Sequence, residues 1–261
     1  MLKRRLIPVL YIKNGLIVRS EGFSYHQNIG NVVNEAKRYN EWNVDELIYI
    51  DISRDKHYDS RRDDHNIKSQ NSIEKIIKSI AKVCFMPLTF GGGIRNIEDI
   101  DFLIKNGADK ITLNTGAFEN PELISQAAKK YGSQAIVISV DYKIIGDQPT
   151  VFTNFGQKNT RTTVFNWIKK CEEMGAGEIF LNSIDRDGKA NGYDMATIKK
   201  VVKSTKLPVI ACGGAGKPED FVNLAKSANV SAIAAGNIFH FTELSYPRAK
   251  TLLKKEGLNF R

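Results

Sequence analysis

The stretch that decides the fold is GGGIRNIEDIDFLIKNGADKITLNTGAF, residues 91–118, which follows the apolar run LTF. It joins a glycine-rich turn to a segment with apolar residues at helical spacing and then to a short β-branched run. That order predicts a strand, a helix and a second strand. A connection of this kind makes the two strands parallel.

The same alternation runs along the whole chain. Strands are predicted at Leu6–Ile12, Leu47–Ile52, Leu88–Phe90, Ile111–Asn114, Ala135–Asp141, Glu178–Ser183, Val209–Cys212 and Ala232–Ala235, with helical patterns that include 73–84, 97–108, 121–132 and 195–205. Eight β–α units without a linker predict an α/β fold, a single (β/α)8 TIM barrel spanning residues 1–261. A doubly wound open sheet is the alternative, but it usually needs fewer strands.

An internal repeat supports a barrel. Residues 212–239, CGGAGKPEDFVNLAKSANVSAIAAGNIF, align with residues 91–118 at a constant offset and without gaps. Identical pairs include Gly92/Gly213, Gly93/Gly214 and Asp99/Asp220. The repeat predicts two similar half-barrels, in which the first strand corresponds to the fifth and Tyr11 takes the place of Asp141.

Composition excludes several classes of protein. The chain of 261 residues has a net charge of +9, but its lysines are scattered beside acidic residues, which indicates a solvated surface and no nucleic-acid site. No apolar run reaches the about 18 residues of a membrane helix, and the start reads as a strand rather than a signal peptide. Cys84, Cys171 and Cys212 match neither a disulfide framework nor a zinc pattern. We therefore expect a cytoplasmic protein without a metal or cofactor.

Glycine-rich turns follow the third and seventh predicted strands, and the fourth and eighth end in LNTGAF and AAGNIFH. Glycines let backbone N–H groups approach an anion closely, although they also simply close tight turns. Two such constellations at one barrel mouth predict a substrate with two phosphates or a diphosphate. The phosphate-binding candidates are Gly92, Gly93, Asn114, Thr115, Asp187, Gly188, Gly213, Gly214, Gly236 and Asn237.

Two carboxylates are expected to face inward at this mouth. Asp141 ends a predicted strand and Asp187 lies just after another, where an aspartate can act as a general acid or base. A helix cap or a loop hydrogen bond is the plainer interpretation and suits Asp187 better. The polar stretch Ser53–Ser72 is predicted to be a long, mobile loop on the same face.

Charged residues stand at the opposite end of four strands. Arg5, Glu46, Lys110 and Glu178 each precede or open a strand, so they are expected on one rim. Two cations and two carboxylates can cancel as a ring around the barrel axis. Solvated charges on the bottom face are an equally good interpretation.

These segments together resemble the cyclase subunit of imidazole glycerol phosphate synthase, the HisF-type barrel of histidine biosynthesis. The resemblance rests on RRLIPVL, VDELIYIDI, FGGGI, GADKITLNT, GSQAIVISVD, GAGEIFLNSIDRDG and ACGGAGKPEDF, in that order along the chain. It implies a substrate with two phosphates, and a HisH-like glutaminase docked on the amino-terminal face that sends ammonia through the barrel. It also implies that the four rim charges gate the ammonia and that Asp109 contacts the glutaminase.

The chain departs from the family pattern at VLYIKNG, residues 9–15, where Tyr11 replaces one of two opposed catalytic aspartates and Asp141 is kept. A phenol with a pKa of about 10 is a poor base at neutral pH. This change resembles a paralogous branch found with surface-polysaccharide genes, which implies amidination of a nucleotide sugar. A genuine cyclase of histidine biosynthesis and a non-catalytic scaffold that activates a glutaminase are the alternatives.

Overall fold

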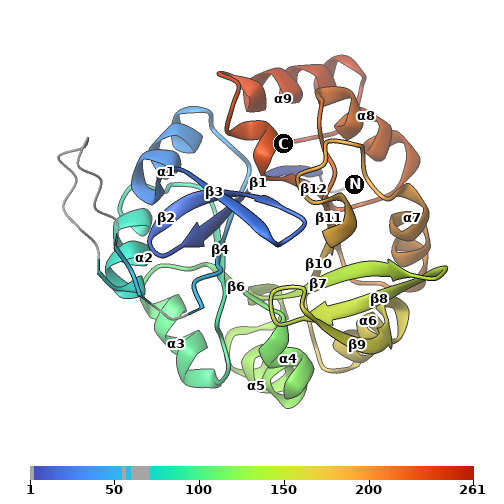
Figure 1. Ribbon diagram of the computed structural model, residues 1–261. Helices are drawn as coiled ribbons and strands as arrows, with labels where there is room; N and C mark the ends of the chain where they lie inside the picture. The colour runs from blue at the N-terminus through green and yellow to red at the C-terminus, as the bar shows by residue number, and fades with distance from the viewer. Residues whose placement is uncertain (1–2, 55–56, 60–70) are drawn as a thin grey trace.

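Eight parallel strands close into a barrel in the computed structural model, which describes residues 3–54, 57–59 and 71–261 (Figure 1). These strands are β1 (Arg5–Lys13), β4 (Leu47–Asp51), β5 (Leu88–Gly91), β6 (Lys110–Leu113), β7 (Ile136–Ile145), β10 (Glu178–Ser183), β11 (Val209–Cys212) and β12 (Ala232–Ala235). Each pairs with the next, and β12 pairs back with β1. The predicted (β/α)8 barrel is therefore confirmed, and the open sheet is excluded. The half-barrel repeat stays a prediction.

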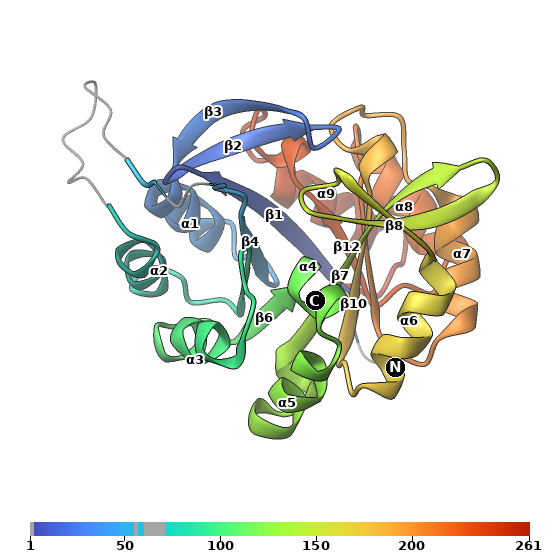
Figure 2. The same cartoon turned by 60° about the horizontal axis from the view of Figure 1, so that its bottom comes forward.

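Helices surround the ring of strands (Figures 1 and 2). They are α1 (Val32–Glu41), α2 (Ile73–Ala81), α3 (Ile97–Lys105), α4 (Thr115–Glu119), α5 (Glu122–Tyr131), α6 (Val164–Glu173), α7 (Met195–Ser204), α8 (Pro218–Ser227) and α9 (Ser245–Lys255), with 3₁₀ turns η1 (Ser133–Ala135), η2 (Ile184–Arg186) and η3 (Asn237–Phe239). Asn31, Ser72, Asn96, Thr163 and Asp194 begin helices by accepting hydrogen bonds from free backbone N–H groups.

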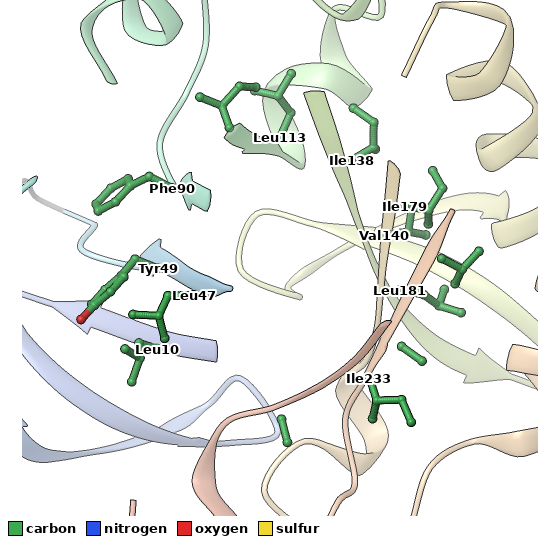
Figure 3. Packing of buried hydrophobic residues seen from close by; sticks show 14 of the residues in the cluster. Leu10, Leu47, Tyr49, Phe90, Leu113, Ile138, Val140, Ile179, Leu181 and Ile233 are labelled. Atoms are coloured by element: carbon green, nitrogen blue, oxygen red, sulfur yellow. The ribbon is translucent and has the colours of Figure 1, made fainter. Parts of the chain in front are cut away.

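Side-chain alternation along the strands separates two apolar layers. Leu10 on β1 and Leu181 on β10 belong to the large layer between strands and helices, part of which is shown in Figure 3. Their neighbours Val9 and Phe180 belong to a smaller cluster of inward-facing residues. Most of the side chains of both clusters are almost fully buried, and each Val, Leu, Ile or Phe among them is worth about 1.5–3 kcal/mol of burial free energy.

Two hairpins that the sequence analysis did not predict extend from the barrel. β2 (Leu16–Glu21) and β3 (Tyr25–Asn31) continue from β1, while β8 (Gln148–Thr153) and β9 (Lys158–Thr163) continue from β7. Both leave the barrel at the carboxyl ends of the parallel strands, where they cover its mouth (Figure 2).

The predicted loop Ser53–Ser72 falls mostly on residues 55–56 and 60–70, which lie outside the described residues. Among the helices that are described, none has the length and apolar character needed to cross a membrane.

Candidate functional site at the carboxyl end of the barrel

The period of two along a strand places charged and polar side chains at both ends of the barrel axis. On β1, Arg5 and Tyr11 share the inward face with Ile7 and Val9 between them. On β10, Glu178 and Asn182 share a face with Phe180 in the same way. Because the strands are parallel, their starts gather at one end and their ends at the other.

A cavity of about 520 Å³ opens at the carboxyl end. Residues from the ends of β1, β4, β5, β6, β7 and β10 line it, together with residues of the β2–β3 hairpin and Phe155 from the β8–β9 turn. Six of the residues predicted from the sequence line this cavity: Tyr11, Gly92, Gly93, Asn114, Thr115 and Asp141.

Asp141 supplies a titratable carboxyl group to this cavity. Its carboxylate accepts hydrogen bonds from Asn114 Nδ2 at 2.8 Å and from Ser139 Oγ at 3.0 Å. Burial raises the pKa of Asp141 from 3.8 to about 7 and outweighs these hydrogen bonds. Both protonation states are therefore populated near neutrality, as a general acid or base requires.

Tyr11 presents a neutral phenol to the same cavity. Its hydroxyl accepts a hydrogen bond from Asn182 Nδ2 at 3.2 Å, and Asn182 stands beside Asp141 in the register of β10 and β7. Burial, and then the charges of Asp187, Cys212 and Asp141, raise the pKa of Tyr11 well above its ordinary value. The phenol can donate a hydrogen bond to a ligand, but it cannot act as a base.

Two buried polar atoms in the cavity have no hydrogen-bond partner among the described residues. They are Asn182 Oδ1 and Thr112 Oγ1. A buried polar atom without a partner costs about 1–3 kcal/mol, so a bound molecule that donates hydrogen bonds to these oxygens would be stabilised.

The glycine turn after β5 brings backbone close to the cavity. Gly92 has a φ of +107°, and a Cβ built on it would lie 2.0 Å from the carbonyl oxygen of Asp51. Only glycine fits there, and Gly92 and Gly93 both border the cavity.

Three of the remaining predicted residues, Asp187, Gly188 and Asn237, lie against the β2–β3 hairpin. Asp187 accepts hydrogen bonds from Ser20 Oγ at 2.7 Å and Phe23 N at 3.3 Å, so it makes the loop hydrogen bonds considered above. Asn237 Nδ2 donates to Ser20 O at 2.7 Å. A Cβ on Gly188, whose φ is +71°, would lie 2.4 Å from Ser20 O.

Gly213 and Gly214 adjoin Ser183 and Gly192, and Gly236 adjoins Val9 and Tyr11. None of the three glycines is among the described residues that line the cavity. Burial raises the pKa of Asp187, because it disfavours the charged carboxylate, and the hydrogen bonds from the hairpin partly offset this rise. The structure thus brings together the first predicted phosphate turn and Asp141, and it places Asp187, Gly188 and Asn237 against the hairpin.

The four predicted rim charges form a closed ring at the amino end. Arg5 Nη1 lies 2.6 Å from Glu46 Oε2, and Arg5 also pairs with Glu178. Lys110 Nζ lies 3.3 Å from Glu46 Oε1 and 3.2 Å from Glu178 Oε2. Burial lowers the pKa of Arg5, but hydrogen bonds and charges from Glu178 and Glu46 overcome it, so that pKa is raised. Asp109 is exposed on this side and accepts from Leu88 N at 2.8 Å.

Sequence reasoning missed the hairpin residues of the site, namely Ser20, Phe23 and His26, and it missed Arg54 after β4. The available signal was Asn14-Gly15, since this dipeptide favours a two-residue hairpin turn. Both residues have positive φ, +52° and +91°.

Comparison with known proteins gives consistent results. Residues 5–245 match the family described as "Histidine biosynthesis protein". Three curated relatives are each named "Imidazole glycerol phosphate synthase subunit HisF". Those from Metallosphaera sedula and Sulfurisphaera tokodaii are 40% identical to the chain over 261 residues, and that from Natranaerobius thermophilus is 38% identical over 261 residues. All three alignments cover 100% of both chains.

Proposed function

Because the chain belongs to the histidine biosynthesis protein family, we propose that it is the ammonia-accepting subunit of an imidazole glycerol phosphate synthase. In this proposal ammonia enters at the amino end of the barrel and reacts with a phosphorylated acceptor at the carboxyl end. One observation carries it: the charged ring and the cavity with Asp141 lie at opposite ends of the same inward strand faces.

The amino-end face supports a glutaminase partner. The curated relatives are named as subunits, and the resemblance implies a HisH-like glutaminase on this side. Phe85, in the loop before β5, is 81% exposed on this face, and an exposed aromatic side chain is typical of an interface. The ring of Arg5, Glu46, Lys110 and Glu178 would then lie at the ammonia entrance.

The barrel interior favours neutral ammonia over ammonium. Ile7, Val137, Phe180 and Ala234 belong to the apolar cluster between the two ends. An ion would lose its hydration there at a large cost, whereas a small neutral molecule would not. At the cavity, Thr112 Oγ1 and Asn182 Oδ1 offer acceptors for the N–H groups of ammonia.

Asp141 would handle the protons of the reaction. Attack by ammonia leaves an extra proton on nitrogen, which the Asp141 carboxylate can accept and then return to the departing group. The backbone at Gly92 and Gly93 would hold a phosphate of the acceptor. Tyr11 would contribute a hydrogen-bond donor.

A second candidate acceptor is favoured by Tyr11 alone. The family pattern has a carboxylate where this chain has a neutral, buried phenol, and that change would disfavour paired acid and base chemistry. A nucleotide sugar is the acceptor implied by the resemblance to the polysaccharide branch, and a glutaminase-activating scaffold is a further alternative. The relatives named above fit the imidazole-forming cyclase better.

The test is turnover of the imidazole glycerol phosphate synthase substrate with excess ammonium salt at raised pH, which removes the need for a partner. We expect product from the wild type, loss of at least about a hundredfold in Asp141→Asn, and little change in Asp147→Asn, which alters an exposed aspartate of the β7–β8 turn. Wild-type protein without product would refute the cyclase. Equal turnover in the two variants would refute the role of Asp141.

A further inference from the structure

A chain of hydrogen bonds joins the β8–β9 turn to the carboxylate of Asp141. The backbone N–H of Asn154, in the turn, donates to Thr115 Oγ1 at 2.9 Å. Thr115 Oγ1 donates to Asn114 Oδ1 at 3.2 Å, and Asn114 Nδ2 donates to Asp141 Oδ2 at 2.8 Å. We call the side chains of Asn114 and Thr115 the relay. The relay spans the junction of β6 and α4, and both of its residues line the cavity.

The two ends of the relay fix the direction of every hydrogen bond within it. A backbone N–H group can only donate, and an ionised carboxyl group can only accept. Thr115 Oγ1 must therefore accept from Asn154 and use its own hydrogen to donate to Asn114 Oδ1. The Asn114 amide is thereby held with Nδ2 facing Asp141. Turned over, the amide would place its oxygen against the carboxylate and lose this bond.

Strand β7 completes the surroundings of the carboxylate. Asn114 Nδ2 also lies 3.3 Å from the carbonyl oxygen of Ser139, which gives the amide a second acceptor on this strand. The hydroxyl of Ser139 donates to the other carboxylate oxygen, Asp141 Oδ1, at 3.0 Å. Each oxygen of the carboxylate thus accepts a hydrogen bond from a protein donor, and the two bonds together set the plane of the carboxyl group at the cavity.

The turn at the far end of the relay has an uncommon backbone. Asn154, Phe155 and Gly156 have φ values of +52°, +58° and +73°. This left-handed conformation is unfavourable for residues other than glycine, and it persists where the surrounding contacts impose it. Gly156 packs against the β2–β3 hairpin, because a Cβ built on it would lie 3.2 Å from Phe23 Cδ2. The turn is therefore held between Phe23 on one side and Thr115 on the other.

We propose that Asn114 and Thr115 are positioning residues, through which the placement of the β8–β9 turn determines the orientation of the Asp141 carboxylate. With the turn in place, Thr115 holds the Asn114 amide against Asp141. When the turn moves away, Thr115 loses its donor, the amide is free to rotate, and Asp141 loses one of its hydrogen bonds. This inference rests on the proposed function, because Asp141 handles the protons of the reaction there.

Other ionisable groups also interact with Asp141, and the relay can be tested separately from them. They are Asp187, Tyr11 and Cys212. Burial is the largest cause of the raised pKa of Asp141, and the charge of Asp187 adds to it. Burial also raises the pKa values of Tyr11 and Cys212, so both groups are neutral near pH 7. The hydrogen bonds of the relay involve none of these three side chains, so a change in the relay leaves them in place.

Titration of Asp141 in the intact chain, followed by NMR of ¹³C-labelled aspartate carboxyl groups, tests the relay without turnover. Thr115→Val keeps the shape of the side chain and removes its hydroxyl. A hydrogen bond to a carboxylate favours the charged form, so weakening it should raise the pKa of Asp141 by about 0.5–1 unit, which is about a threefold to tenfold change in proton affinity. Thr115→Ser restores the hydroxyl and should keep the wild-type pKa. Thr251→Val, at an exposed position on α9, is the matched control and should also keep it.

A double variant tests whether Thr115 acts through Asn114. Asn114→Ala removes the donor itself and should raise the pKa of Asp141 at least as much as Thr115→Val does. Adding Thr115→Val to Asn114→Ala should then change the pKa no further. Three results would overturn the proposal: a wild-type pKa in Thr115→Val, an equal rise in Thr115→Ser and Thr115→Val, or additive shifts in the double variant. These titrations need no substrate, so failure of the turnover test above would not produce any of these results.

Discussion

The substitution Glu46→Gln tests the charge ring most sharply. Glu46 is 1% exposed and is contacted by Arg5, by Lys110 and by Thr89 Oγ1 at 3.0 Å. Glutamine has almost the same shape, but it leaves the ring with two cations and one carboxylate. The buried guanidinium of Arg5 would then depend on Glu178 alone.

The expected loss of stability follows from this burial. Removing one partner of a buried ion pair costs about 3–5 kcal/mol. The side chain of Lys110 is 22% exposed, so water can solvate part of the excess charge. We therefore expect a loss of about 3 kcal/mol. With a denaturant dependence of about 3 kcal/mol per molar urea, the midpoint of unfolding would fall by about 1 M.

Urea unfolding followed by circular dichroism would measure this shift. Glu173→Gln, at an exposed position near the end of α6, is the matched control and should stay within about 0.5 kcal/mol of the wild type. Adding Lys110→Gln to Glu46→Gln restores neutrality and should recover part of the loss. A midpoint that does not move in Glu46→Gln would refute the view that these charges depend on one another.

Three further outcomes are expected. The pKa of Asp141 is raised from 3.8 to about 7, so its contribution to stability is complete below about pH 4 and is lost as the pH rises towards 7, by about 4 kcal/mol in all. Asp141→Asn should therefore flatten the fall of the unfolding free energy with pH. An unchanged dependence of the unfolding free energy on pH would contradict the burial of the Asp141 charge. Tyr11→Phe should lower kcat/KM for ammonia-dependent turnover about tenfold to a hundredfold while costing about 1 kcal/mol of stability, and an unchanged kcat/KM would mean that the phenol only packs. Gly188→Ala should loosen the β2–β3 hairpin, because the new Cβ would lie 2.4 Å from Ser20 O. Hydrogen exchange at Gly22 N, which donates to Asp187 O, should then become faster than in the wild type. Wild-type protection of Gly22 N in the variant would contradict this contact.

The sequence was sufficient to predict the barrel and both ends of its axis. Period-two alternation within a strand and helical period between strands are local signals, and they locate every parallel strand. The same alternation places Arg5 and Tyr11 on one face, so the positions of the ring and of Asp141 also follow from local pattern.

The coverage of the mouth could not be predicted in the same way. The Asn14-Gly15 turn is a local signal, but the contacts of Ser20 with Asp187 and Asn237 join residues more than 160 positions apart. The repeat treats the two glycine turns as equivalent, whereas only the turn after β5 is among the described residues that line the cavity. The pKa of Asp141 depends on how deeply its carboxyl group is buried, and the local sequence pattern does not predict that depth.

The passage of ammonia through the barrel is tested most directly by isotope transfer. The chain would be combined with a HisH-type glutaminase from the same organism, glutamine labelled with ¹⁵N in its amide, excess unlabelled ammonium and the synthase substrate. We expect the product to carry ¹⁵N at the incorporated nitrogen, because ammonia released at the charged ring reaches Asp141 without mixing with solvent. A product that carries mainly unlabelled nitrogen would contradict the route through the barrel.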